Sequence, residues 1–238
     1  MTATPRLLPH PADVDPRVRR LARKAKRQES KRHLILRGAR ETLLRHGPLA
    51  FTMDQVASAA DTSKASLYYY FRSREEMIGA LAIDVLRREV EVLTTAVSAA
   101  DSGTDALAAL VRARVTHYMA EPDDFRILYL WAPMLDGPQR LLLTEVHALT
   151  AVVNTTVEAK LARDRKAGLL HPEAQPQQLA QLGWLTAHGL LSFTLGSAHA
   201  PPSTLLSWRD LCDTACTTLI RAARASHPDL PLGDRTKT

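Results

Sequence analysis

The sequence predicts an all-α protein. Ala and Leu are abundant, whereas Phe, Tyr and Trp are few among the 238 residues, a composition that favours helices. Apolar residues recur at intervals of three and four along most of the chain, as they do on one face of a helix. We find neither a convincing strand pattern nor an internal repeat. The length allows a small N-terminal unit and a larger helical domain with its own core.

Residues 1–29 are predicted to form a basic, proline-rich, flexible arm. Four prolines occur in residues 1–16, and residues 17–32 contain nine Lys or Arg and one acid. The basic run could be a charged extension of the first helix. Alternatively, it could follow a DNA backbone or enter a minor groove, as the basic arms of some helix-turn-helix proteins do. We favour the second interpretation, because the run leads directly into the segment described next.

Residues 30–76 are predicted to form a compact unit of short helices. The first helix covers about 30–46 and ends at Gly47-Pro48. Thr52, Ser63 and Ser73 each precede a short helical pattern and are suitable N-cap residues. The turn between the two middle helices contains Asp61, which tolerates a left-handed backbone better than most residues. Two short helices joined by such a turn form a helix-turn-helix unit, whose second helix enters the DNA major groove.

The pattern in residues 30–85 agrees at many positions with that of one family of regulators. The agreeing residues are Ile35, Ala39, Leu43, Gly47, Thr52, Val56, Ala57, Ala60, Ser63, Leu67, Tyr68, Tyr70, Phe71, Ser73, Arg74 and Glu75. Together they resemble the DNA-binding signature of the TetR family of transcriptional repressors. Asp61 and Thr62 depart from it, because the family usually has glycine and valine there. The resemblance implies a homodimer that binds a palindromic operator.

The candidate DNA contacts form two groups, according to the part of the DNA that their side chains can reach from the second helix of this unit. Those placed to read base edges are Lys64, Ala65, Ser66 and Tyr68. Those suited to phosphates are Thr52, Ser63, Tyr69, Tyr70 and Arg74. The tyrosines could instead be packing residues, and part of Tyr70 is expected to be, because Leu67 and Phe71 must anchor the helix to the core.

Residues 77–226 are predicted to form a helical body for ligand binding and dimerisation, followed by a flexible tail at 227–238. Expected helices run from Ser73 to about 99, then over about 105–119, from 122, and over 139–167, 177–197 and 203–225. Gly103 is read as a break and Thr104 as a cap. The last two helices are expected to pair with their copies as a four-helix bundle. The apolar positions that favour this pairing are Leu182, Leu185, Leu190, Phe193, Leu205, Leu211 and Leu219.

The body carries a second, shorter resemblance. Trp184, His188 and Gly189 spell W-x-x-x-H-G, which resembles the motif of one TetR C-terminal subfamily. Trp184 and His188 lie one helical turn apart, so they could line a ligand cavity or a dimer contact, or could be a structural pair within the core. Other residues that could border an apolar pocket, or simply fill the core, are His117, Tyr118, Phe125, Tyr129, Trp131, Met134 and His147. The family resemblance implies a small, mainly apolar effector.

Charge and motif content narrow the function. Residues 1–76 contain 16 basic and 8 acidic groups, a net charge of +8, whereas the remaining 15 basic and 17 acidic groups give −2. This asymmetry indicates a polyanion partner for the N-terminal unit only. No nucleotide-binding glycine loop, nucleophile elbow or zinc-enzyme motif is present, so we expect neither an enzyme nor a cofactor.

Cysteine usage and hydropathy point to a cytoplasmic protein without a membrane span. Cys212 and Cys216 form no disulfide framework, and their spacing suggests two small buried residues rather than an oxidant sensor. The histidines are scattered, so no metal site is expected. Two alternatives remain open: a constitutive or architectural DNA-binding protein without an effector, and a helical ligand carrier or enzyme.

Overall fold

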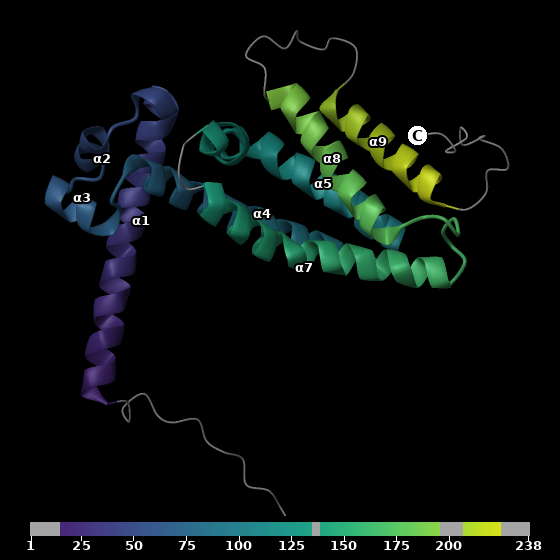
Figure 1. Cartoon of the computed structure of the whole chain (residues 1–238), viewed down its shortest axis with the longest axis horizontal. Helices are drawn as coiled ribbons and strands as arrows, with labels where there is room; N and C mark the ends of the chain where they lie inside the picture. Colours follow the sequence, from purple (N-terminus) through teal and green to yellow (C-terminus); the bar gives the residue numbers. More distant parts are fainter. Residues whose placement is uncertain (1–14, 135–138, 196–206, 225–238) are drawn as a thin grey trace, which may run out of the picture. The chain divides into compact units, whose positions relative to one another are not determined.

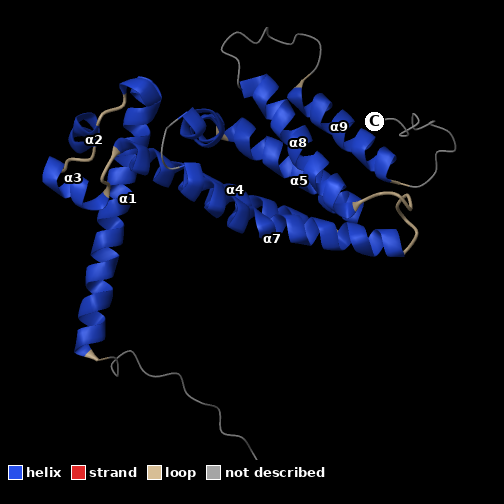
Figure 2. Ribbon diagram, in the orientation of Figure 1, coloured by secondary structure: helices blue, strands red, loops and turns tan. Residues whose placement is uncertain are grey.

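The computed structural model describes residues 15–134, 139–195 and 207–224, and almost all of these are helical (Figures 1 and 2). The contacts divide the chain into two compact units, Met1–Met77 and Ile78–Thr238. The boundary between them falls near the start of one long helix, α4 (Arg74–Ala99). The all-α prediction is confirmed.

The first unit begins with a longer helix than the sequence suggested. α1 spans Pro16–Ala50, so residues 16–29 continue the first helix and the prediction of a flexible arm is wrong for them. Asp15 caps the helix by accepting a 2.7 Å hydrogen bond from the backbone N–H of Arg17. Pro16 suits the first helical position, and the Arg, Lys, Ala and Gln residues that follow are good helix formers. Residues 1–14 and the tail at 227–238 lie outside the described part of the chain.

Gly47 ends the regular part of α1, as predicted. Its φ of 73° interrupts the helical backbone before Pro48, a conformation that glycine adopts without steric cost. α1 then packs closely on the next helix, α2 (Met53–Ala59). Gly38 makes this approach possible, because a Cβ there would lie 3.0 Å from the Cβ of Ala60.

The predicted caps of the short helices are confirmed. Thr52 forms a capping box with Gln55 at the start of α2. Ser63 accepts from the N–H of Ser66 at 3.2 Å at the start of α3 (Lys64–Tyr70). Ser73 accepts from the N–H of Glu76 at 3.1 Å at the start of α4. Asp61 has a φ of 44°, so the turn between α2 and α3 adopts the left-handed conformation expected of it.

The second unit is a bundle in which one helix is central. It contains most of α4, then α5 (Gly103–Ala120), α6 (Pro122–Phe125), a π-helical turn η2 (Arg126–Trp131), a 3-10 turn η3 (Ala132–Met134), α7 (Gln139–Lys166), α8 (Pro176–Leu195) and α9 (Trp208–Ala223). α5 packs against α7, α8 and α9. The buried apolar residues between these helices include Leu93, Val97, Leu110, Val153, Val157 and Leu161.

The start of α5 differs from the prediction. Ser102, not Thr104, is the cap and accepts from the N–H of Asp105, while Thr104 is buried. Gly103 does not break the helix but begins it. A Cβ on Gly103 would lie 2.5 Å from the backbone of Leu161 in α7, and its N–H donates to Asp164 at 2.6 Å. A glycine is therefore needed at position 103, because a side chain there would prevent the close approach of the α5 and α7 backbones.

Three classes of feature are absent from the described residues. They form no strand, only an isolated bridge between Leu170 and Arg224. None of their helices is long and apolar enough to cross a membrane. Within the same part of the chain, no three His, Cys, Asp or Glu side chains gather as metal ligands would.

Candidate functional site

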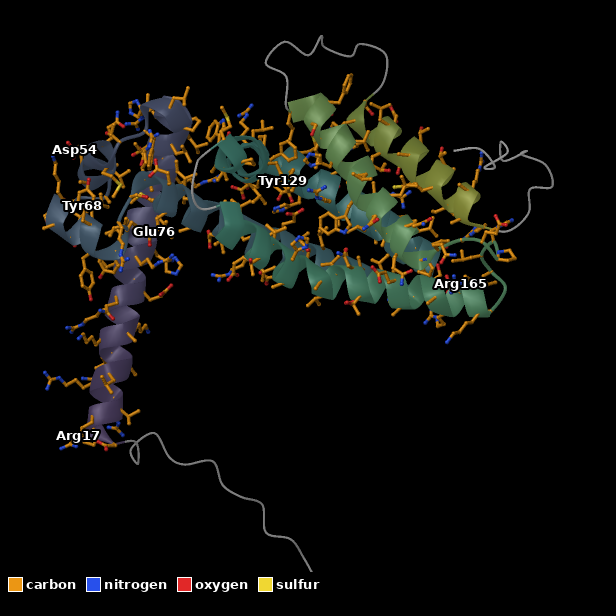
Figure 3. All side chains as sticks on the ribbon, viewed as in Figure 1. Arg17, Asp54, Tyr68, Glu76, Tyr129 and Arg165 are labelled. Atoms are coloured by element: carbon orange, nitrogen blue, oxygen red, sulfur yellow. The ribbon has the colours of Figure 1, made fainter. Side chains whose placement is uncertain are left out.

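The second helix of the helix-turn-helix unit, α3, has one side buried against the core of the unit and one side exposed to solvent. Leu67 is buried, and Phe71 directly after the helix is buried with it. Lys64, Ala65 and Tyr68 are exposed, and Tyr69 is 70% exposed. Figure 3 shows Tyr68 on this helix and Asp54 on the neighbouring α2. An exposed, polar and aromatic helix face of this kind fits the edge of a major groove.

Lys64 is held by a carboxylate on the preceding helix. Its Nζ lies 2.8 Å from Oδ2 of Asp54, and both side chains are exposed. The hydrogen bond to Asp54 raises the pKa of the Lys64 ammonium above its usual value. The lysine is therefore charged at neutral pH, and it must share or leave Asp54 to reach a base edge.

The tyrosines of α3 have different surroundings. The Tyr69 hydroxyl accepts a 3.2 Å hydrogen bond from Nε2 of Gln28 in α1, and its ring meets that of Tyr70 edge to face at 5.2 Å between centroids. Tyr70 is half-buried, as expected for a residue that partly packs. Ser66 is also half-buried, although it lies near the start of the helix.

The remaining predicted phosphate contacts are helix caps or lie beside them. Thr52 and Ser63 are exposed, and each accepts a backbone hydrogen bond while its hydroxyl hydrogen stays able to donate. Arg74 is more constrained. Its Nε lies 2.5 Å from Oε1 of Glu75, and its Nη1 donates to the carbonyl of Leu49 at 3.5 Å. A phosphate would have to compete with Glu75 for this guanidinium.

A buried polar cluster lies in the second unit. Glu89 of α4 is 0% exposed and Arg114 of α5 is 2% exposed, with 2.6 Å between Oε1 and Nε. The other carboxylate oxygen of Glu89 accepts from the hydroxyls of Tyr118 at 2.7 Å and Tyr129 at 2.8 Å. Arg114 also donates to the backbone carbonyl of Trp184 at 3.2 Å. Every charge in the cluster thus has close partners, as buried charges require.

Aromatic rings surround this ion pair. The guanidinium carbon of Arg114 lies 4.9 Å from the ring centroid of Tyr129 and 4.7 Å from that of Trp184. His188 lies 5.7 Å from Phe125 and 5.2 Å from Tyr129 between ring centroids. The ring of Tyr129 is labelled in Figure 3. α4, α5, α8 and the segment that contains Phe125 and Tyr129 all contribute to the cluster.

Burial and charge perturb the titration of these groups. Burial, and then the Glu89 carboxylate, raise the pKa values of Tyr118 and Tyr129 far above that of a free tyrosine. Burial, and then the positive charge of Arg114, lower the pKa of His188 below its usual value. Both tyrosines therefore stay protonated and His188 stays neutral at pH 7. The cluster combines apolar rings with a few oriented polar atoms, a composition typical of small-molecule sites.

The predicted ligand-binding residues are only partly brought together. Phe125, Tyr129, Trp184 and His188 join the cluster, and His117 lies beside it with its ring centroid 4.8 Å from that of Tyr118. The residues that do not join it in the described structure are Trp131, which is half-buried, and Met134 and His147, which are exposed. Nε2 of His117 is buried without a hydrogen-bond partner among the described residues.

The two central residues of this cluster, Glu89 and Arg114, were not among the predicted site residues. Glu89 lies among the apolar positions Val85, Leu86 and Leu93 of α4, and Arg114 lies among the buried residues of α5. A charge on an otherwise apolar helix face was the available signal. Asn154 of α7 was also missed. Its Oδ1 accepts a 2.5 Å hydrogen bond from the indole N–H of Trp184.

The two cysteines are buried, as the sequence analysis favoured. Cys216 makes a long contact of 3.9 Å from its Sγ to the carbonyl oxygen of Ala108. A hydrogen bond with Cys216, together with burial, raises the pKa of the Cys212 thiol. Because the thiolate is the reactive form, this shift makes the Cys212 thiol less reactive, whereas the same hydrogen bond lowers the pKa of Cys216.

Comparisons with known proteins agree with this architecture. Residues 35–81 match the family model described as bacterial regulatory proteins, tetR family. No curated protein matches the chain. Among solved structures, a protein with unknown function from Rhodococcus sp. RHA1 has a TM-score of 0.65 at 21% identity, over 82% of this chain and 95% of that one.

Two further solved structures are regulators. The TetR family transcriptional regulator PfmR from Thermus thermophilus has a TM-score of 0.58 at 20% identity, covering 79% of this chain and 97% of that one. The transcriptional regulator FadR from Bacillus subtilis, in complex with stearoyl-CoA, has a TM-score of 0.63 at 11% identity, covering 81% and 99%. At these identities the likeness shows a shared fold.

Proposed function

We propose that this chain is a DNA-binding transcriptional regulator of the tetR family, acting as a repressor that binds a palindromic operator as a homodimer. The tetR-type match over residues 35–81 supports the family. The observation that carries the proposal is the exposed face of α3, on which Lys64, Ala65 and Tyr68 are open to solvent. The N-termini of α2 and α3 in the same unit are both capped. One such helix per subunit would read one half-site in the major groove.

DNA contacts are assigned within this unit by chemistry. Lys64, Ala65, Ser66 and Tyr68 would meet base edges. The hydroxyls of Thr52, Ser63, Tyr69 and Tyr70 and the guanidinium of Arg74 would meet phosphates. Tyr69 is the clearest of these, because it is exposed and oriented by Gln28. Arg74 is the most constrained, because it also contacts Glu75.

Dimerisation is proposed through α8 and α9. Leu182, Leu185, Gly189 and Phe193 of α8 follow a spacing of three and four residues and are all exposed, which makes a continuous apolar stripe on one side of the helix. No atom lies within 4 Å of a Cβ built on Gly189, so a second helix could approach closely there. Leu190 and Leu211 are half-buried, Leu219 already packs within its own chain, and Leu205 lies outside the described residues.

The effector is proposed to be a small molecule with a long apolar part, bound beside the cluster of Glu89 and Arg114. Phe125, Tyr129 and His188 offer aromatic surface there, while Arg114 and Tyr118 are fixed by Glu89. The FadR structure contains stearoyl-CoA, which makes acyl-CoA esters the first class to test. A ligand releases DNA only if it binds more tightly to the form that does not fit the operator.

Operator selection tests this proposal. The full chain would be incubated with random duplexes, and the enriched sequence measured by fluorescence anisotropy with and without acyl-CoA esters or free fatty acids. We expect a palindromic site and an affinity that falls at least about fivefold with the effector, which is the weak end of typical allosteric coupling. A selected site that no ligand affects would indicate a constitutive DNA-binding protein. Failure to enrich any duplex would contradict the proposal as a whole.

A further inference from the structure

The N-terminal half of α1 carries a row of cations along one side. Arg17, Arg20, Lys24, Arg27 and Lys31 alternate in steps of three and four residues, and at about 100° per residue they occupy an arc of about 80°. The first four are exposed, and Lys31 is half-buried. We call these five residues the cationic row. Two other basic residues, Arg19 and Lys26, lie on a different side of the helix, whereas Arg23 lies about 40° beyond the edge of the row at Arg27.

The acid in this stretch does not interrupt the row. Glu29 is the one acidic residue among residues 16–34, and it lies about 120° or more from every member of the row on a helical projection. It pairs with His33 at 3.0 Å on its own face. The row thus presents only positive charge.

The side of α1 that contacts α3 adjoins the row. Gln28 lies next to it on the projection, and its amide donates to the hydroxyl of Tyr69 in α3. Arg32, one turn further, stacks over the ring of Phe71 with 5.2 Å from Cζ to the ring centroid. These contacts fix the helical extension to the side of the unit that presents Tyr69, so both elements can meet the same duplex.

The dimensions of the row fit a DNA backbone. From Arg17 to Lys31 the helix rises about 21 Å, which corresponds to roughly six base pairs of duplex. Positive charges spaced by about one turn along a straight helix match a line of phosphates better than they match a flat anionic surface such as a membrane. A membrane-binding helix would need a broad apolar face opposite its charges, whereas only Val18 and Leu21 are large exposed apolar residues in this segment.

We propose that residues 16–31 of α1 form a second DNA-contacting element, which lies on the phosphate backbone outside each half-site and lengthens the footprint. This inference rests on the proposed function. The helix reads no bases in this role. It adds sequence-independent affinity through release of counterions from the phosphates.

A pair of matched variants tests the proposal. The variant K24Q/R27Q removes one Lys and one Arg from the cationic row, and R19Q/K26Q removes the same two residue types from another side. Each full-length protein would be titrated, across a salt series, with the selected operator, either bare or with about eight flanking base pairs on each side. Hydroxyl-radical footprinting on the longer duplex would locate the protected phosphates.

We expect the wild type to bind the longer duplex at least about tenfold more tightly and to protect the flanks. K24Q/R27Q should lose this gain and lower the log–log salt slope by about 0.9 per lost phosphate contact, whereas R19Q/K26Q should keep most of it. Equal losses in the two variants, or no gain from flanks in the wild type, would overturn the inference. In those cases operator binding itself would persist, so the proposed function would stand.

A third variant separates a rod from a flexible polycation. A25P keeps every charge but breaks the helix in the middle of the row, because proline removes a backbone donor and clashes with the preceding turn. We expect A25P to lose the flank-dependent gain. The proposal of a rigid DNA-contacting helix is wrong if A25P retains the full gain. It is also wrong if the wild type binds anionic vesicles more tightly than the flanked duplex.

Discussion

Glu89 and Arg114 meet at 2.6 Å in the interior of the second unit, and neither side chain is more than 2% exposed. Such a pair is costly to bury but more costly to break, because one partner alone would be an uncompensated charge. This ion pair connects α4 to the central helix α5. The boundary between the two units falls within α4. The stability of the second unit therefore depends on an ion pair that is also part of the site proposed for the effector.

Removing the charge of Glu89 should strongly destabilise the protein. E89Q would leave Arg114 buried without a counterion, and we expect the free energy of unfolding to fall by about 3 to 5 kcal/mol, measured by urea denaturation. E91Q, an exposed position on the same helix, should change it by less than about 0.5 kcal/mol. Similar small losses in both variants would mean that the ion pair contributes little.

Alkaline pH should destabilise the second unit. Tyr118 and Tyr129 have pKa values raised above that of a free tyrosine, by burial and by Glu89. The unfolded chain then releases protons near pH 10 that the folded chain retains, so stability is intact below about pH 10 and falls as pH rises further. Denaturation at pH 8 to 11 should show a shallower fall for Y118F than for the wild type. Equal pH profiles would contradict this assignment.

His188 should titrate below the usual histidine range. Burial, and then Arg114, lower its pKa, so the neutral ring is favoured in the folded state. Its contribution to stability is present above about pH 6.5 and is lost as pH falls through the folded pKa. NMR of the histidine Cε1–H signals, assigned by their loss in H188N, would measure this. A measured pKa at or above the usual histidine value would contradict it.

Asp54 should restrain Lys64 in DNA binding. D54N removes the carboxylate that holds the lysine at 2.8 Å, and we expect severalfold tighter operator binding, because the freed lysine can reach its base edge. K64Q should change base preference at one position per half-site, measured by repeating the selection. In the double variant D54N/K64Q the gain should vanish. If the gain persists there, Asp54 acts by its own repulsion of DNA and not through Lys64.

Charging the exposed stripe of α8 should prevent dimerisation. L185E/F193E places two carboxylates on positions that are 67% and 61% exposed in the single chain, so the monomer fold should be retained. Light scattering should then report a monomer, with operator affinity reduced at least about tenfold because two half-sites are no longer bound together. V152E, on an exposed position of α7, serves as the control and should remain dimeric. A dimeric L185E/F193E would place the interface elsewhere.

The helix-turn-helix unit could be predicted from local chemistry. Thr52, Ser63 and Ser73 are cap residues whose effect is confined to one helical turn, and the structure confirms all three. The extent of α1 was misjudged, because prolines and dense charge in residues 1–29 resemble those of a disordered arm. Asp15 and Pro16 start a helix there instead. Proline at a first helical position is a start signal, whereas the prediction counts Pro16 among the prolines of a flexible arm.

The buried cluster was only half predictable. Phe125, Tyr129, Trp184 and His188 were candidates because their types suit ligand sites. Glu89 and Arg114 are 25 residues apart, and no local pattern pairs them. Their burial depends on how α4 and α5 pack, which is a tertiary property. The same reason explains Gly103, whose role was visible only once Leu161 lay against it.

The contact of Gly103 with α7 constrains how the second unit can rearrange. The backbones of α5 and α7 touch there without an intervening side chain, and the Gly103 N–H is fixed to Asp164. Helices joined at such a point cannot slide past each other without losing that bond. A rearrangement that kept the bond would have to be a rotation about this junction, with its largest displacement at the far end of α5, which carries Arg114 and Tyr118.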